Sequence, residues 1–189
     1  SRIGGLVGRS SQSIRACLSE CPITFGFQGS NPTPKKVTAA GGLVGFNDNG
    51  ALVQNCRSHA SLGPARAGIT YTIERAGGSV GYNRGSLDSS YSKGRLSLND
   101  STSASSIGGL IGWSRSNVVN SYSVMDVFMT LVMGGKDIGG LIGYNSGSVS
   151  YCYSVISRAG SSAIIVGGFA GMNAGTIVDS VFNSKIHTG

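Results

Sequence analysis

Residues 139–152 read Gly-Gly-Leu-Ile-Gly-Tyr-Asn-Ser-Gly-Ser-Val-Ser-Tyr-Cys, and versions of this stretch return along the whole chain. Gly-Gly-Leu-Val-Gly stands at 4–8 and 41–45, Gly-Gly-Leu-Ile-Gly at 108–112, Gly-Gly-Ser-Val-Gly at 77–81 and Gly-Gly-Phe-Ala-Gly at 167–171. Successive copies start 37, 36, 31, 31 and 28 residues apart. Such self-similarity predicts a repeat protein. The uneven period favours coils with loops of variable length over a repeat of fixed helices.

The similarity continues in four further positions of each copy. A large side chain, mostly aromatic, follows the last Gly of the motif at Phe46, Tyr82, Trp113, Tyr144 and Met172, with Arg9 in the first copy. The next residue is Asn47, Asn83, Asn145 or Asn173, with Ser10 and Ser114 as departures. After a turn that holds Gly50, Gly85, Gly147 or Gly175, an aliphatic residue stands at Ile14, Val53, Leu87, Val118, Val149 and Ile177. Three positions later comes a small residue, at Cys17, Cys56, Ser90, Ser121, Cys152 and Ser180.

This pattern predicts strand, tight turn and strand in every copy. The Gly-rich motif is a poor helix, since each Gly costs about 1 kcal/mol there, and Asn-x-Gly supplies a positive φ at a turn. Two strands cannot bury their own faces, but identical coils stacked about 4.8 Å apart can. Asn ladders would then satisfy one another's amides, and Gly would allow corners or close backbone approach. We therefore predict an all-β fold, a parallel β-solenoid (a three-sided β-helix) of about six coils that fills residues 1–189 as one domain.

Each copy ends in a variable segment, and these segments cover 20–40, 59–76, 93–107, 124–138 and 155–166. We expect a third strand at 69–73 and at 95–98, where the residues alternate, and loops elsewhere. Loops that leave a repeat scaffold commonly carry binding. The two longest segments, 20–40 and 59–76, are therefore the first candidates for recognition.

Composition narrows the function classes. Only 12% of residues are charged, the net charge is +7, and the pI is about 9.5. The net charge is positive because acids are scarce, and no nucleic-acid motif occurs. We therefore expect no nucleic-acid partner. The longest apolar run, 124–133, is too short to cross a membrane and contains Asp126 and Thr130, so we expect no membrane insertion. No signal peptide is visible and the first residues already lie in a repeat, so we expect a fragment of a longer protein.

The motif resembles the GLUG repeats, named for Gly-Leu-any-Gly. The residues that carry the resemblance, including the glycines of the two looser copies, are Gly42, Leu43, Gly45, Gly78, Gly81, Gly109, Leu110, Gly112, Gly140, Leu141, Gly143, Gly168 and Gly171, with Gly5-Leu6-Val7-Gly8 in the first copy. Ser79 and Phe169 replace Leu in the looser copies. Such repeats occur in large bacterial exoproteins, including filamentous-haemagglutinin-like adhesins and immunoglobulin A peptidases. The resemblance implies an extracellular or cell-surface location and a scaffold role, and it transfers no catalytic residue.

Catalytic and metal sites find little support in the sequence. Gly77–Gly81 matches the Gly-x-Ser-x-Gly nucleophile pattern, but Ser79 occupies the Leu position of the repeat. Its partner would have to be His59 or His187. No Cys or His pair has the spacing of a metal site. We expect no cofactor, no metal and no enzymatic activity.

The four cysteines leave alternatives open. Cys17 and Cys21 could form a disulfide across a loop, and Cys17 could also approach Cys56, which holds the same position in the neighbouring copy. Cys56 and Cys152 are interpreted as small buried residues that are interchangeable with Ser.

The acids also bear on function, because some solenoids are polysaccharide-cleaving enzymes with paired carboxylates. The eight acids occupy different positions in different copies, at Glu20, Asp48, Glu74, Asp88, Asp100, Asp126, Asp137 and Asp179. The leading hypothesis is therefore a bacterial surface adhesin that binds a protein or glycan of a host or neighbouring cell. The alternatives are a filament subunit that self-associates through the solenoid ends and, third, a carbohydrate-active enzyme.

Overall fold

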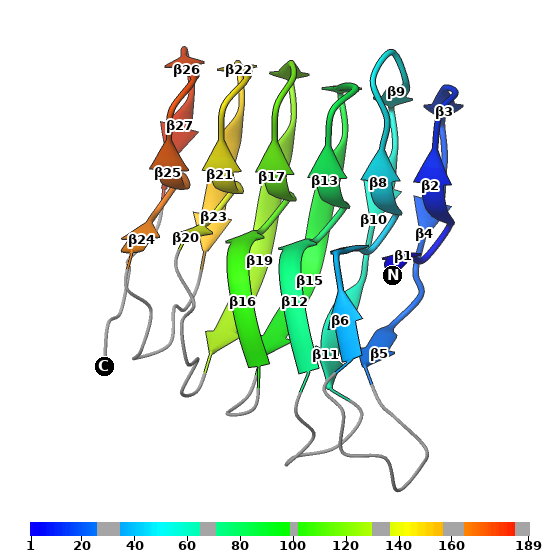
Figure 1. The fold of residues 1–189 in the computed structure, drawn as a ribbon. Coiled ribbons are helices and arrows are strands. Elements are labelled where there is room, and N and C mark those ends of the chain that lie inside the picture. Colours follow the sequence, from blue (N-terminus) through cyan, green and yellow to red (C-terminus); the bar gives the residue numbers. More distant parts are fainter. Residues whose placement is uncertain (26–34, 65–70, 99–101, 130–136, 157–164, 184–189) are drawn as a thin grey trace, which may run out of the picture.

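The computed structural model describes residues 1–25, 35–64, 71–98, 102–129, 137–156 and 165–183, and all of its regular elements are β-strands. The strands form four parallel sheets stacked in register, six coils deep (Figure 1). The predicted parallel β-solenoid of about six coils is confirmed. In Figure 1 the coils run side by side, from the first at the N-terminal end to the sixth at the C-terminal end.

Each coil contributes one main strand to each sheet. Sheet A contains β1 (Arg2–Gly4), β7 (Ala39–Gly41), β12 (Tyr71–Gly77), β16 (Thr102–Gly108), β20 (Asp137–Gly139) and β24 (Ile165–Gly167), with β6 (Lys35–Val37) beside β12. Sheet B contains β2 (Val7–Ser10), β8 (Val44–Asn47), β13 (Val80–Asn83), β17 (Ile111–Ser114), β21 (Ile142–Asn145) and β25 (Ala170–Asn173). Sheet C contains β3 (Ile14–Arg15), β9 (Leu52–Gln54), β14 (Ser86–Asp88), β18 (Val118–Val119), β22 (Ser148–Ser150) and β26 (Thr176–Val178). Sheet D contains β4 (Leu18–Ser19), β10 (Arg57–Ser58), β15 (Tyr91–Leu98), β19 (Tyr122–Met129), β23 (Tyr153–Ile156) and β27 (Val181–Phe182), with β5 (Ile23–Phe25) and β11 (Ser61–Pro64).

The Gly-Gly-Leu-x-Gly motif is a break between two strands, where the sequence pattern predicted one strand. In the second coil β7 ends at Gly41 and β8 begins at Val44, so Gly42 and Leu43 form the joint. Leu43 is fully buried there. Sheets A and B follow one another along one side of the coil in Figure 1, sheet C crosses the top and sheet D returns behind. Each coil therefore passes through four sheets, where the sequence pattern predicted three sides.

The glycines of the motif are required for space. An added Cβ on Gly112 would stand 2.6 Å from the Gly81 oxygen and 2.7 Å from the Ala76 nitrogen, both of which belong to the preceding coil. The same position in the other inner coils is equally crowded by backbone. Backbones of neighbouring coils thus meet at this glycine of sheet B at a distance that excludes any side chain.

The prediction of a positive φ at each Asn-x-Gly turn holds at one place. Gly50 has a φ of 79°, whereas Gly85, Gly147 and Gly175 are absent from the positive-φ residues among the described positions. The left-handed conformation stands instead just before the small position of each coil, at Ala16, Asn55, Ser89, Asn120, Tyr151 and Asp179. This residue turns the chain from sheet C to sheet D, a corner that the sequence pattern did not reveal.

The small position stabilises that corner. Ser90 Oγ donates a hydrogen bond to the backbone carbonyl oxygen of Asp88 at 2.8 Å and accepts one from the backbone nitrogen of Cys56, in the preceding coil, at 3.1 Å. Ser121 and Ser180 make the same pair of contacts. The slot therefore prefers Ser or Cys because the side chain must be short and able to donate.

The core consists of two aliphatic layers, and each layer runs through successive coils of the solenoid. One layer lies between sheets A and D, and it includes Ile73, Leu96 and Ile107. The other holds the Leu and aliphatic positions of the repeat, such as Leu110 and Val118. The predicted Asn ladder exists in two parts, with Asn47 Nδ2 to Asn83 Oδ1 at 2.8 Å and Asn145 Nδ2 to Asn173 Oδ1 at 2.7 Å. Ser114 interrupts it, as the sequence indicated.

Buried serines between the two core layers were not recognised from the sequence. Ser19, Ser58, Ser92 and Ser154 donate to the carbonyl oxygen of the second motif Gly in the next coil, at 2.7, 2.7, 2.6 and 3.0 Å. Ser123 occupies the same slot, and its buried hydroxyl has no hydrogen-bond partner among the described residues. In the last coil Phe182 takes this position. In the sequence, a Ser stands two residues after the small position in every copy except the last.

The variable segments contain more strand than predicted. Ile73 lies in β12 and residues 95–98 lie in β15, so the two expected third strands are confirmed for their described residues. However, β16 and β19 also run through parts that were expected to be loop. Pairing with the neighbouring coil extends these strands.

Candidate binding surface

The variable segments are anchored along one edge of the solenoid. On each coil sheet D ends and sheet A begins at this edge, and the flanking strand ends are Phe25 and Lys35, Pro64 and Tyr71, Leu98 and Thr102, Met129 and Asp137, and Ile156 and Ile165. Leu98 is in register with Met129, and Tyr71 with Thr102. We call this the anchoring edge. The candidate segments 20–40 and 59–76 include residues 26–34 and 65–70, which lie outside the described residues.

An aromatic row runs along sheet B, in which Phe46 and Tyr82 are buried and Trp113 and Tyr144 are half-buried. Ring centroids of Phe46 and Tyr82 are 4.9 Å apart, those of Tyr82 and Trp113 are 5.4 Å apart, and those of Trp113 and Tyr144 are 5.0 Å apart. These residues fill the predicted aromatic position of four successive coils. They pack against each other and against Ala39 of sheet A, apart from the two core layers.

Arginines cover this row. The guanidinium carbon of Arg75 stands 4.5 Å from the Tyr82 ring centre and 4.6 Å from that of Trp113. Arg2 lies 4.7 Å from the Phe46 ring, and Arg115 donates to the Tyr82 hydroxyl at 3.3 Å. A cation over an aromatic face is attracted by the ring quadrupole. Phe46, Tyr82, Trp113 and Tyr144 with Arg2, Arg75 and Arg115 are called the aromatic–arginine row below.

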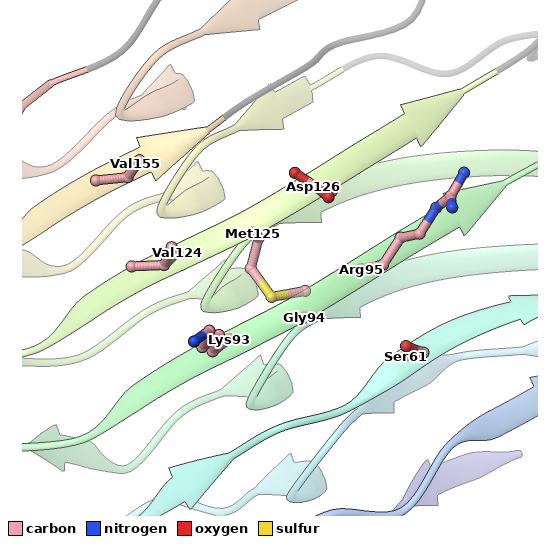
Figure 2. A pocket seen from close by; sticks show the side chains of 8 residues that line it. All are labelled: Ser61, Lys93, Gly94, Arg95, Val124, Met125, Asp126 and Val155. Atoms are coloured by element: carbon pink, nitrogen blue, oxygen red, sulfur yellow. The ribbon is translucent and has the colours of Figure 1, made fainter.

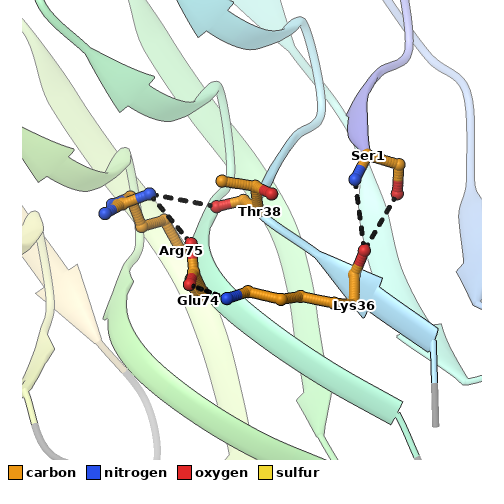
Figure 3. A network of polar contacts seen from close by, with 5 residues as sticks. All are labelled: Ser1, Lys36, Thr38, Glu74 and Arg75. Atoms are coloured by element: carbon orange, nitrogen blue, oxygen red, sulfur yellow. Dashed lines mark hydrogen bonds and ion pairs between the residues drawn. The ribbon is translucent and has the colours of Figure 1, made fainter.

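Polar contacts fix Arg75 in its place (Figure 3). Its Nη1 donates to Glu74 Oε2 at 3.2 Å and to the Thr38 oxygen at 3.4 Å. Lys36 Nζ pairs with Glu74 Oε1 at 2.6 Å. The network joins two coils and holds the guanidinium between two rings, so the positive charge on this face has a defined position.

A second aromatic feature lies on the outside of sheet D. Tyr91, Tyr122 and Tyr153 stack with ring centroids 4.6 and 4.7 Å apart and planes 9° apart. Burial, and then the neighbouring tyrosines, raise the pKa of Tyr122. In the sequence this stack corresponds to a Tyr that directly follows the small position in three successive copies.

A hollow of about 350 Å³ lies beside the tyrosine stack. Its lining residues come from neighbouring strands of sheet D (Figure 2), and they are Ser61, Lys93, Gly94, Arg95, Val124, Met125, Asp126 and Val155. The hollow combines basic, acidic and apolar groups, and one of its lining residues, Met125, also belongs to the core layer between sheets A and D.

The structure separates the residues of the Gly-x-Ser-x-Gly pattern. Ser79 is buried in the Leu position, and its hydroxyl donates to the backbone carbonyl oxygen of Tyr91 at 3.2 Å. The His59 ring packs against the Tyr91 ring at 5.7 Å on the outer face of sheet D, and His187 lies outside the described residues. Ser79 is therefore buried at the break between sheets A and B, whereas His59 is exposed beside sheet D. Among the described residues, no group of three or more His, Cys, Asp or Glu side chains could hold a metal ion.

Three of the acids have separate polar partners. Asp48 accepts from Arg9 Nε at 2.8 Å, and this hydrogen bond lowers the pKa of Asp48. Partial burial opposes ionisation of Asp88, but hydrogen bonds led by Gln54, at 2.9 Å, lower its pKa overall. Glu74 belongs to the Arg75 network. Both carboxylates with lowered pKa values are suited to fixing local structure and unsuited to donating a proton near neutral pH.

All four cysteines are free thiols in the structure. Cys56 and Cys152 are buried, as interpreted from the sequence, and burial raises the pKa of both, that of Cys152 to about 11. Cys17 packs beside the core and Cys21 is exposed. The Cys17–Cys21 disulfide stays a prediction.

Comparison with known proteins returned no matching family model, no matching curated protein and no matching solved structure. Within the described part of the chain, no helix has the length and hydropathy needed to span a membrane.

Proposed function

We propose that this chain is a non-enzymatic scaffold within an extracellular adhesin on a bacterial surface, and that its variable segments carry recognition. The observation that supports this proposal is the anchoring edge, where the strand ends of neighbouring coils stand in register. The partner would be a protein or glycan on a host cell or a neighbouring cell. The extracellular location rests on the resemblance to GLUG repeats.

The architecture suits such a role. Each coil is held by ladders of backbone hydrogen bonds and by buried Asn and Ser contacts, so the strand ends at the anchoring edge have defined positions. Neighbouring strands of a sheet lie about 4.8 Å apart, which places several segments within reach of one ligand. Rigid scaffolds that present variable loops are a common solution for binding.

The exposed Arg2 and Arg115 of the aromatic–arginine row, with the half-buried Trp113 and Tyr144, offer an additional contact surface. Aromatic rings and Arg are enriched where proteins bind partners, and the net charge of +7 favours partners with negative groups. A glycan that carries carboxylate or sulfate groups fits this surface as well as an acidic protein does.

The test is adhesion of segment variants. Residues 26–34 are replaced by a Gly-Ser segment of equal length in one variant, and residues 65–70 in another. The matched control changes the exposed Asn49 and Asn117, in the turns between sheets B and C, to Ser. The assay measures binding of purified chain to cells and to immobilised neutral and acidic glycans. Loss of binding in either segment variant with an unchanged control supports the proposal. Unchanged adhesion in both segment variants refutes the placement.

A filament subunit, which would associate end to end through its outermost coils, is the second candidate. Among the described strands, those of the first and last coils have a neighbouring coil on one side only. Leu6 and Leu18 are about half exposed in the first coil, as are Met172 and Val181 in the last. Unpaired strand edges are templates for association. Sedimentation over a concentration series tests this idea, and a monomer at every concentration, for the native chain and for Val181→Lys alike, counts against it.

A further inference from the structure

Cys17 and Cys56 stand in the same slot of the first and second coils. Ile14 pairs with Val53 on one side of them and Leu18 with Arg57 on the other, with equal numbers of residues between. The Arg57 nitrogen donates to the Cys17 oxygen at 2.8 Å. The two Cα atoms are therefore separated by about one strand spacing, ~4.8 Å, within the roughly 4.4–6.8 Å that a disulfide spans.

The two thiols point the same way. Cys17 Sγ lies 3.2 Å from the Arg15 oxygen, and Cys56 Sγ lies 3.2 Å from the Gln54 oxygen, so each contacts the carbonyl two residues before it. Cys56 Sγ also lies 3.6 Å from the Ile14 oxygen, which places it toward the first coil. Burial is the main cause of the raised pKa of the Cys56 thiol, and Cys17 also contributes to its electrostatic environment.

The two cysteines differ in access. Cys17 is partly exposed, whereas Cys56 is buried. An oxidant from solution therefore reaches Cys17 first, and Cys56 is placed to react with it from inside. Such an exposed thiol beside a buried partner is suited to a two-step exchange.

We propose that Cys17 and Cys56 form a disulfide between the first two coils when the chain meets a low-molecular-weight disulfide such as oxidised glutathione. The Cys17 thiolate attacks one glutathione sulfur and releases the first glutathione thiol. Cys56 then attacks Cys17 Sγ, the new protein disulfide forms, and the second glutathione leaves as a thiol. The two cysteines together lose two electrons and two protons, and the two released glutathione thiols carry these electrons and protons.

The other cysteines lack this arrangement. The neighbours of Cys152 in its slot are Ser121 and Ser180, which cannot form disulfides. Cys21 is exposed, with its Sγ 3.7 Å from the Pro22 oxygen, whereas Cys17 packs beside the core. The geometry therefore favours Cys56 over Cys21 as the partner of Cys17. This inference does not depend on the proposed adhesin function.

The experiment uses the full chain, folded and reduced, in a series of glutathione redox buffers. Free thiols are trapped by alkylation, and unreduced tryptic peptides are analysed by mass spectrometry. Peptide 16–35 contains Cys17 and Cys21, and peptide 37–57 contains Cys56. We expect the two peptides to be joined, with a loss of two of the four free thiols, and fragmentation to place the bond on Cys17.

Variants make the assignment independent of fragmentation. The linkage should persist in Cys21→Ser and disappear in Cys17→Ser and Cys56→Ser. These variants should fold, because Ser occupies the slot of Cys17 and Cys56 in three other coils, and circular dichroism checks this. A bond between Cys17 and Cys21, a linkage of Cys21 to Cys56, or glutathione on Cys21 alone across all buffers would overturn the proposal.

Discussion

Substitution of Gly112 by Ala tests whether the repeat motif requires glycine for space or for backbone freedom. Its φ lies outside the range that disfavours other residues, since Gly50 and Gly94 are the glycines with positive φ among the described residues. If only chain flexibility mattered, Ala would stabilise the fold by about 0.4–1 kcal/mol by restricting the unfolded state. The structure predicts the opposite sign.

The magnitude follows from the contacts that the new methyl group would make. It would lie 2.6 Å from the Gly81 oxygen and 2.7 and 2.9 Å from the Ala76 nitrogen and oxygen, where ordinary contact begins at 3.4 Å. All three neighbours are backbone atoms, so no side chain can rotate away. Overpacking of this kind costs about 1–3 kcal/mol.

Relief of the overlap would require the third and fourth coils to separate. Their joint includes hydrogen bonds from the Ser79 and Val80 nitrogens to the Leu110 oxygen, at 2.9 and 3.0 Å, each worth about 1 kcal/mol net. After the opposing entropy gain, we expect Gly112→Ala to lower the free energy of unfolding by about 2–4 kcal/mol.

Gly8 provides a matched control within the same chain. It holds the position of Gly112 in the first coil, but an added Cβ would meet only the Arg2 oxygen, at 3.3 Å. Gly8→Ala should therefore change stability by less than about 1 kcal/mol. Urea unfolding, followed by circular dichroism and by the fluorescence of Trp113, the one Trp of the chain, measures both variants. Equal effects at Gly8 and Gly112, or a more stable Gly112→Ala, would refute the steric explanation.

Three further predictions concern a corner residue, a carboxylate and the Cys17–Cys56 disulfide. Tyr151→Asn should stabilise the chain by about 0.5–1 kcal/mol in urea unfolding, because Asn tolerates a left-handed conformation better than Tyr does. Tyr151 has a φ of 53° and is largely exposed, so little packing is lost. A destabilised variant would contradict this prediction. The lowered pKa of Asp88 means that its stabilisation is complete above the ordinary value of 3.8 and is lost as the pH falls through the folded pKa. Asp88→Asn should therefore be less stable than the native chain near pH 7 and equally stable at acid pH, and a gap that persists in acid would show another cause. Oxidation of Cys17 and Cys56 closes a loop of about 40 residues and should stabilise the chain by up to ~4 kcal/mol. The measurement is a shift of the urea midpoint that dithiothreitol reverses. No shift after confirmed oxidation would show that bond strain cancels the gain.

Much of the fold followed from the sequence because a solenoid pairs each position with its own equivalent. When Leu110 stacks on Leu141 and Asn47 on Asn83, a one-residue slip would destroy every ladder at once. Six copies of one pattern therefore predict the register, the parallel sheets and the buried aliphatic and Asn positions without knowledge of any long-range contact.

The corners and outer surfaces depended on the tertiary structure. The sequence pattern placed the positive φ at Asn-x-Gly, whereas the left-handed corner falls on residues as different as Ala16, Ser89 and Tyr151. Composition alone does not mark such a position, because the hydrogen bonds of the following Ser or Cys impose the conformation. The pairing of Arg75 with Tyr82 and Trp113 was equally hidden, since it joins residues from two sheets and neighbouring coils.

The sequence by itself determined that identical coils stack, and that aliphatic and Asn side chains form ladders inside them. Only the tertiary structure decided why the motif glycines are needed, because their neighbours belong to the preceding coil and are backbone atoms that no residue pattern records. It also decided that the variable segments are attached along one edge, since sheets A and D meet there in every coil. Contacts between equivalent positions can be read from a repeat, whereas contacts between different positions of neighbouring coils require the coordinates.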